Sequence, residues 1–234
     1  MRRTTMIIAA ALAAVSVLAI GVVSATAGSS SQPMSAPASA DARMAQMAHM
    51  SQAQGLTRSD LRSLLGRQLG EHAALAMNAT NLGVIGSPAF PAAAKALDRN
   101  SVALSKSIAA VYGKAAGKAF LDGKFQWRAH IGFFVDYTVA VAKKDKAAQK
   151  KAVANLKRYT VEHGKLLGGA TGLPPKAVQA DLLQHVLELK GQLDAYASKQ
   201  YAKAASLYQD AYAHMFMTAD LLAGAIAKQK NLPN

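Results

Sequence analysis

Residues 176–197 read KAVQADLLQHVLELKGQLDAYA, and this stretch shows how the chain folds. Val178, Leu182, His185 and Leu189 follow one another at steps of three and four residues. Side chains at these steps lie on one face of an α-helix. The stretch therefore predicts an amphipathic helix whose inward stripe contains one imidazole among aliphatic side chains.

The same periodicity continues through most of the chain from Leu56 onward, with Gly and Pro between the runs and no sustained β alternation. A fourth helix is expected to begin at the N-cap Asp145 and to stop at Gly168-Gly169. The other five are expected at about residues 59–82, 91–112, 115–143, 176–197 and 201–228, with Asp122-Gly123 as a point where the third could be interrupted.

The predicted helices form three similar pairs. His72, His130 and His185 occupy corresponding places in the first helix of each pair, at spacings of 58 and 55 residues. One αα unit cannot bury its apolar stripe alone, so the units must pack together. We therefore predict an all-α fold, a helical bundle of about six helices built from three αα-hairpin repeats.

The N-terminal residues have the features of an export signal. Arg2 and Arg3 precede an apolar run over residues 6–23, and Ala25 and Ala27 form the small-x-small pattern that signal peptidase recognises. We predict cleavage after Ala27, and hence a secreted or cell-envelope protein. The alternative is an uncleaved segment that anchors the chain in the membrane, which would be its only membrane contact.

The sequence divides into three parts on this basis. Residues 1–27 are the predicted signal peptide, residues 28–55 a flexible tail rich in Met, Ser and Ala, and residues 56–230 the helical bundle domain. The chain has no cysteine, which excludes disulfides and a lipid-anchored lipoprotein. An exported fold without disulfides must draw its stability from core burial.

The chain is strongly basic, with a formal net charge of +14, or +12 without residues 1–27. Such a charge on an exported protein favours contact with anionic cell-wall polymer, phospholipid or nucleic acid, and the alternative is that it serves only solubility. The lysines are spread over several helices, most densely at residues 143–151, and no aromatic side chains interleave with them. Specific nucleic-acid binding is therefore not predicted.

Five of the six histidines fall on the inward stripes of five different helices. They are His72, His130, His163, His185 and His214. A single core histidine is ordinary once its nitrogens are satisfied by partners, whereas one per helix in a bundle suggests convergence on a metal or haem site. Both interpretations stay open at the level of sequence.

The absence of several known motifs argues against some kinds of metal site. No Glu precedes a His by three residues, and His-Glu-x-x-His is absent, so bundle-type di-iron and zinc-peptidase sites are not indicated. Covalent c-type haem would need cysteine. The remaining ligands are His with Met or carboxylate, and Met215 follows His214 directly. This set favours copper, with the axial positions of a non-covalent haem as the weaker alternative.

The tail contains a second candidate site for a soft metal. Met47, His49 and Met50 lie within four residues, and Met44 precedes them. Thioethers with an imidazole suit Cu(I), so these residues predict a weaker capture site. The alternative is an amphipathic extension of the first helix, in which methionine fills space.

Motifs for catalysis are lacking. The chain has no Cys nucleophile, no Gly-x-Ser-x-Gly and no phosphate-binding Gly-x-x-x-x-Gly-Lys, and no carboxylate pair is marked. The sequence therefore favours a binding protein over an enzyme.

Several short motifs between residues 61 and 226 carry a resemblance to a known group of proteins. They are Glu71-His72-Ala-Ala-Leu75, Ala96-Leu97-Asp98-Arg99-Asn100, Val111-Tyr112-Gly113, Trp127-Arg-x-His130, Ala170-Thr-Gly-Leu-Pro174, His185-Val186 and Tyr212-Ala-His214-Met215. With these the chain resembles exported bacterial helical-repeat proteins of unassigned function, which implies export and an all-helical build.

Some members of that group are labelled copper amine oxidase. Enzymes of that kind are much larger, are rich in β-structure and make their cofactor from Tyr in an Asn-Tyr-Asp/Glu motif. This chain has neither an Asn-Tyr pair nor a His-x-His motif. The label is therefore no evidence for copper binding in this chain, and that hypothesis depends on the His and Met residues alone.

The leading hypothesis from sequence is a cell-envelope binding protein that holds a transition metal, with copper favoured. His72, His130, His185 and His214 are the expected inner ligands. The alternatives are a cofactor-free structural or interaction module that contacts anionic cell-wall polymers, and a non-covalent haem protein.

Overall fold

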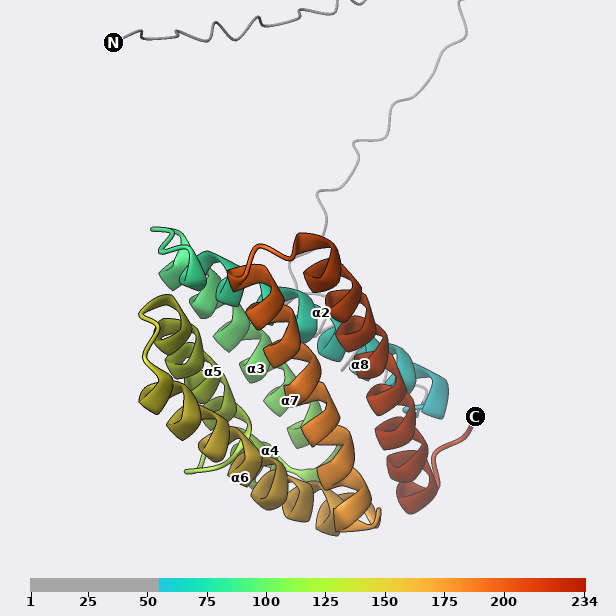
Figure 1. Ribbon diagram of the computed structural model, residues 1–234. Helices are drawn as coiled ribbons and strands as arrows, with labels where there is room; N and C mark the ends of the chain where they lie inside the picture. The colour runs from blue at the N-terminus through green and yellow to red at the C-terminus, as the bar shows by residue number, and fades with distance from the viewer. Residues whose placement is uncertain (1–54) are drawn as a thin grey trace, which may run out of the picture. The chain divides into compact units, whose positions relative to one another are not determined.

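The computed structural model describes residues 55–234, which form a helical bundle with no strand in that range (Figure 1). The predicted signal peptide, the predicted tail and its Met47, His49 and Met50 lie outside the described residues. No helix within the described part has both the length and the apolar character needed to cross a membrane.

Seven helices make up the described part of the chain. They are α2 (Arg58–Val84), α3 (Phe90–Tyr112), α4 (Lys114–Leu121), α5 (Trp127–Ala142), α6 (Lys146–Thr171), α7 (Pro175–Ala197) and α8 (Tyr201–Lys230). The all-α prediction is confirmed. The expected helix over residues 115–143 is in fact two helices, α4 and α5. The three pairs are α2–α3, α5–α6 and α7–α8, and the short helix α4 connects the first pair to the second.

The break between α4 and α5 has a local cause. Asp122 has an extended backbone, and Gly123 has φ +146°, a value that only glycine adopts without strain. Another glycine, Gly113 with φ +90°, separates α3 from α4. The eight residues of α4 therefore lie between two backbone positions that no helix can continue through.

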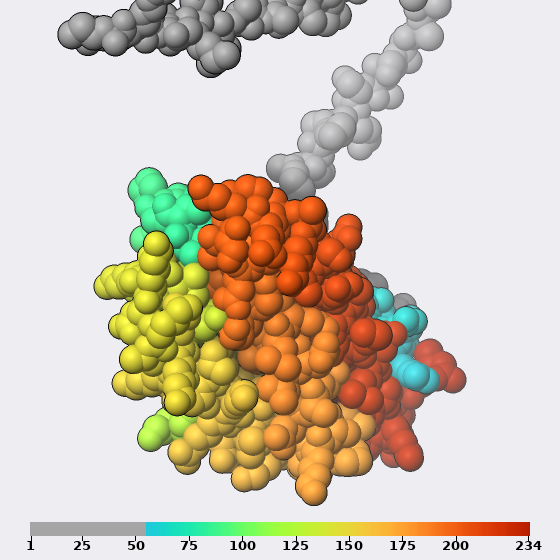
Figure 2. All heavy atoms as spheres, in the orientation of Figure 1, coloured from blue at the N-terminus to red at the C-terminus, as the bar shows by residue number. Residues whose placement is uncertain are grey.

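Helix α2 is central to the arrangement. It packs against α3, α5, α7 and α8, while α6 contacts α5 and α7. Figure 2 shows α5 to α8 covering the face in view, with the beginning of α2 visible at its right-hand edge. The chain ends close to where α2 begins, because the Arg58 N–H donates to the Pro233 carbonyl at 2.7 Å.

Side-chain N-caps fix the beginnings of helices α2 and α6. Thr57 and Asp60 form a capping box at α2, in which each side chain accepts from the other's backbone N–H. Asp145 caps α6 by accepting from the Ala148 N–H at 2.9 Å, as the sequence predicted. These caps hold the long helices whose inward faces supply the core.

One large apolar cluster fills the interior and draws on all seven helices. It contains many of the aliphatic residues of the predicted stripes, among them Leu61, Leu65, Leu182 and Leu189. Five imidazoles lie within this apolar interior, and they define the candidate site.

Candidate functional site

Each of the five inward histidines is buried, and each comes from a different helix. His72 lies on α2, His130 on α5, His163 on α6, His185 on α7 and His214 on α8, all with 5% exposure or less. The stripes predicted from the sequence are therefore correct in placing every one of these imidazoles inside the bundle.

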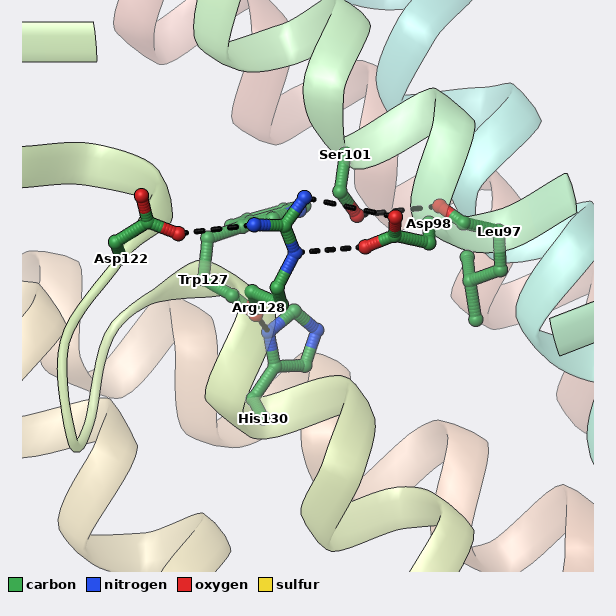
Figure 3. Close-up of polar contacts among 7 residues, drawn as sticks. All are labelled: Leu97, Asp98, Ser101, Asp122, Trp127, Arg128 and His130. Carbon is green, nitrogen blue, oxygen red and sulfur yellow. Dashed lines mark hydrogen bonds and ion pairs between the residues drawn. The ribbon is translucent and has the colours of Figure 1, made fainter. Parts of the chain in front are cut away.

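His72 and His130 form the closest pair. Their Nε2 atoms face one another at 3.4 Å, and their ring centroids are 5.3 Å apart. The Nδ1 of His130 donates to the Trp127 carbonyl one turn earlier in α5, as Figure 3 shows. Because Nδ1 carries the proton, the Nε2 of a neutral His130 presents its lone pair to His72.

An ion-pair bridge fixes the beginning of α5, which carries Trp127 and His130 (Figure 3). The Arg128 guanidinium donates to Asp98 on α3 at 2.7 Å and to Asp122, just after α4, at 2.9 Å. These charges are about half exposed, so they contribute orientation more than stability. Arg128 thus points outward and holds the turn from which the two aromatic rings point inward.

Trp127, the only tryptophan of the chain, is the aromatic centre of the cluster. Its ring centroid lies 4.8 Å from those of His72 and His130 and 5.8 Å from that of His163. Its buried Nε1–H has no hydrogen-bond partner among the described residues.

His185 extends the cluster from α7. Its ring lies 6.0 Å from His72 and 6.3 Å from His214, measured between centroids. Neither of its ring nitrogens has a hydrogen-bond partner in the described part of the protein. An imidazole with two unsatisfied buried nitrogens is rare enough to need an explanation.

His163 lies at one side of the cluster. Its Nδ1 bonds to Oε1 of Gln126 at 2.6 Å, and its ring stacks on Tyr159, which in turn stacks on His130. Tyr159 thus separates His163 from the facing pair. Its Nε2 is buried and has no partner among the described residues.

His214 differs from the others because carboxylates occupy both of its nitrogens. Its Nδ1 donates to Glu188 at 2.9 Å and its Nε2 to Asp181 at 3.1 Å, both on α7. The hydrogen bond to Asp181, with help from Glu188, raises the pKa of His214 to about 9. His214 is therefore a cation at neutral pH, and no nitrogen is left for a metal while these bonds hold.

Burial has the opposite effect on the other four imidazoles. It lowers the pKa of His163 to about 3 and the pKa values of His72, His130 and His185 well below 6.5. Neighbouring imidazoles lower the pKa of His72, His130 and His185 further. All four are neutral at physiological pH, which is the form that binds metals.

Two hollows flank the imidazoles. A small void of about 20 Å³ is lined by His72 and His130 together with apolar side chains and Thr80, and no Asp or Glu between residues 55 and 234 lines it. A larger cavity of about 190 Å³ is lined by His185, by the aromatic residues Trp127, Phe120 and Tyr112, by two threonines and otherwise by apolar side chains.

The predicted site residues thus separate into groups. The structure brings His72, His130 and His185 together. His163 is separated from them by Tyr159, and both nitrogens of His214 are occupied by carboxylates. Met215 lies in the wall of the larger cavity. No group of three or more His and carboxylate side chains within residues 55–234 forms a ready metal centre.

Sequence reasoning missed Asp181 as a partner for a buried imidazole. Asp181 lies four residues before His185 on α7, and this spacing could have identified it as a neighbour of the same face. Gln126 was missed because it precedes α5 and belongs to no periodic stripe.

No protein-family model matches the chain, and neither does any curated protein or solved structure. The class of protein is therefore defined by the molecule itself, as an all-α bundle with a buried imidazole layer of five histidines, of which His214 is charged and the other four are neutral.

Proposed function

We propose that this chain is an exported copper-binding protein that holds one Cu(I) ion between His72 and His130. The observation that carries the proposal is the pair of Nε2 atoms facing one another at 3.4 Å in the core. Its location outside the cytoplasm is proposed from the N-terminal signal pattern.

The separation of the two nitrogens suits a shared ion. Two nitrogens at about 2.0 Å from one metal and 3.4 Å apart subtend an angle of about 115° at the metal. This angle is typical of three- or four-coordinate sites, and a slight opening of the pair gives the more linear two-coordinate geometry that Cu(I) also accepts. Little movement of either ring is needed.

The protein also fixes the tautomer and the ring orientation of His130, as a metal-binding histidine requires. A ligating imidazole ordinarily donates its other N–H to a carbonyl or carboxylate, which fixes its tautomer and direction. The Trp127 carbonyl accepts this bond from His130. The lone pair of Nε2 is therefore already aimed at the proposed ion.

The surroundings favour a monovalent ion. In the described part of the chain no carboxylate lines the void beside the pair, and a divalent ion there would keep two uncompensated charges in an apolar interior. Zinc also ordinarily takes four ligands, whereas two imidazoles face one another here. The void of about 20 Å³ has room for one water-sized ligand completing the coordination.

Haem is less well supported by the same geometry. The larger cavity, at about 190 Å³, is smaller than the pockets of about 300 Å³ and more that hold drug-sized ligands. A porphyrin would need the helices to separate.

The test is an anaerobic competition for Cu(I) between the purified chain and a chromophoric chelator. We expect one tightly bound equivalent, and loss of affinity by roughly 100-fold or more in His72→Phe and in His130→Phe, since even supporting partners of ligands contribute 10- to 100-fold. X-ray absorption at the copper edge should show nitrogen neighbours at about 2 Å.

His163→Phe is the matched control, because it also removes a buried imidazole but one outside the facing pair. It should keep wild-type affinity. Met47, His49 and Met50 are replaced by alanine in a parallel chain, so that binding to the tail is not counted. Unchanged affinity in both His72→Phe and His130→Phe, or no uptake at all, would contradict the proposal.

The basic face of α6 supports a second candidate function, contact with anionic cell-wall polymer. Its exposed cations are Lys146, Lys150, Lys151, Lys157, Arg158 and Lys165. Metal-free protein should then bind purified cell wall in low salt and be released by high salt, because screening weakens exposed charge pairs. Binding that is insensitive to salt would contradict this candidate.

A further inference from the structure

The larger cavity is a second hollow with a wall and an entrance of its own. Its wall draws on all seven helices and is almost wholly apolar, and neither His72 nor His130 belongs to it. A water molecule needs several polar partners, which such a wall does not offer. An apolar group therefore gains free energy by entering this cavity from water, independently of the copper pair.

The entrance lies where the end of α3, helix α4 and the last turns of α6 meet. The lining residues that are at least partly exposed are Ile108, Tyr112, Ala116, Ala119, Leu166 and Ala170. All of them come from these three segments, whereas the lining residues of α2, α5, α7 and α8 are buried. An apolar group therefore enters from this side of the bundle.

The last turn of α8 reaches the same entrance. The Tyr112 hydroxyl donates to Oε1 of Gln229 at 2.7 Å, and Nε2 of Gln229 donates to the Ala170 carbonyl at 2.9 Å. Tyr112 and Ala170 both line the cavity, so the Gln229 side chain bridges its rim from α3 to α6. Lys230 follows, with its Nζ 4.6 Å from the centroid of the Tyr112 ring. A cation therefore lies at the rim.

The segments around the entrance carry positive charge only. Residues 104–121, 163–180 and 221–234 contain no Asp or Glu. Their exposed lysines are Lys106, Lys114, Lys118, Lys165, Lys176, Lys228 and Lys230. The acidic residues that directly flank these ranges are Asp122, Glu162, Asp181 and Asp220. Each of these carboxylates already pairs with a cation of the chain. The charge around the entrance therefore suits an anion.

The volume of the cavity limits the apolar part of a ligand. An engineered apolar cavity of about 150 Å³ binds benzene, a ring of six carbons. Scaled to about 190 Å³, the same packing takes about eight carbon atoms. A charged group inside the cavity would lose its hydration without replacement, so it must stay at the entrance.

We propose that this cavity binds the apolar part of a small amphiphile with one anionic group, and that the anionic group stays at the entrance beside Lys230. Medium-chain fatty acids and short carboxylic acids that end in an aromatic ring share this chemistry. The apolar wall provides the affinity for the buried part, and the lysines distinguish the anion from a neutral compound of the same length.

The experiment titrates carboxylates of increasing length into the metal-free full chain, followed by calorimetry and ligand NMR. Pentanoate has about half the chain that the cavity takes, and nonanoate fills it. Affinity should rise about fourfold for each added CH₂ between these two. It should level off at dodecanoate, because the additional carbons stay outside. Hydrocinnamate has as many carbons beyond its carboxylate as nonanoate, so comparing the two shows whether the wall prefers a ring or a chain.

The role of charge is tested with nonanol, which has the chain of nonanoate without the carboxylate. Nonanoate should bind about fivefold more tightly in low salt, and high salt should reduce the difference. Lys230→Gln should weaken nonanoate by about threefold and leave nonanol unchanged. The matched control is Lys203→Gln, because Lys203 is exposed near the opposite end of the same helix.

Filling the cavity tests the location. Ala170→Phe places a ring at the entrance from α6, and Ala116→Phe does so from α4, so that one folded variant suffices. Each should weaken nonanoate and nonanol by about tenfold or more. The matched control is Ala202→Phe, because Ala202 is exposed on α8 and lines neither hollow.

The proposal is overturned if neither nonanoate nor hydrocinnamate binds, or if nonanol binds as tightly as nonanoate in low salt. An affinity that keeps rising to dodecanoate, or wild-type binding in both filled variants, would also overturn it. Copper affinity is measured on the same variants. Lys230→Gln and Ala170→Phe should leave it unchanged, so failure of one proposed site is distinguishable from failure of the other.

Discussion

At the scale of single residues, the five buried histidines show that the same residue type can be charged or neutral within one core. His214 is protonated because Asp181 and Glu188 enclose it. Desolvation keeps His72, His130, His163 and His185 neutral, and no Asp or Glu of the described residues hydrogen-bonds to them. At His214 the hydrogen bonds to its two carboxylate partners outweigh desolvation, whereas desolvation is the largest effect on the pKa of each of the other four.

The raised pKa of His214 predicts how stability depends on pH. Its pKa is about 9 in the folded chain against 6.5 ordinarily, so the stabilisation is complete below pH of about 6.5 and is lost as pH rises through about 9. His214→Gln should lower the free energy of unfolding by about 3 kcal/mol at pH 6, because it removes the cation between Asp181 and Glu188, whose other hydrogen-bond donors, Thr218 and Gln184, are uncharged.

Urea unfolding of the wild type and of His214→Gln at pH 6, 8 and 10 measures this effect. The difference between the two proteins should shrink as pH rises, and other titrating groups cancel in that difference. A difference that is constant from pH 6 to pH 10 would show that His214 is not charged in the folded chain.

The sequence predicted the burial of these residues but not their pairing. Steps of three and four fix which face of a helix a residue occupies, and that was enough to place all five imidazoles inside. Which imidazole meets which depends on how far each helix is displaced along its axis relative to its neighbours. That displacement is set by turns and caps, and periodicity carries no information on it.

At the scale of helices, glycines account for the differences between the predicted and observed boundaries. The fourth helix was expected to stop at Gly168-Gly169, but α6 continues to Thr171 and ends at Gly172, which has φ +74°. A glycine inside a helix costs only about 1 kcal/mol relative to alanine. A Cβ on Gly168 would lie 2.9 Å from the Leu173 carbonyl oxygen, so its role is close approach and not termination.

Gly123 predicts a clear effect of substitution at the α4–α5 break. Gly123→Ala should destabilise the fold by about 1–3 kcal/mol, because φ +146° strains any residue with a Cβ. The new Cβ would also lie 2.8 Å from Cγ of Gln126, which holds His163. Equilibrium urea unfolding measures the change.

Gly132 on α5 is the matched control, since a Cβ there meets nothing within 4 Å. Gly132→Ala should stabilise the chain by about 0.5–1 kcal/mol through the higher helix propensity of alanine. The same sign for both substitutions would contradict the proposed strain at Gly123.

At the scale of the whole molecule, the imidazole layer joins all three helix pairs. α2 supplies His72, α5 and α6 supply His130 and His163, and α7 and α8 supply His185 and His214. We therefore expect one cooperative unfolding transition, because no pair can separate without exposing imidazoles that pack on another pair.

Far-UV circular dichroism and the proton resonances of the histidine rings measure this cooperativity in urea. Both should give the same midpoint, and the five buried rings should lose their native signals together. Early loss of the His214 signal alone would instead indicate that α7–α8 opens as a separate unit.

The position of the single tryptophan has a practical consequence. Trp127 lies 4.8 Å from the rings of His72 and His130, measured between centroids, and its side chain also forms part of the wall of the larger cavity. Trp127 is therefore close to both proposed sites. A metal bound between the two imidazoles should quench the tryptophan fluorescence, and a ligand in the larger cavity should shift its emission maximum. The intrinsic tryptophan fluorescence of the wild-type chain can therefore report binding at both sites without an attached dye.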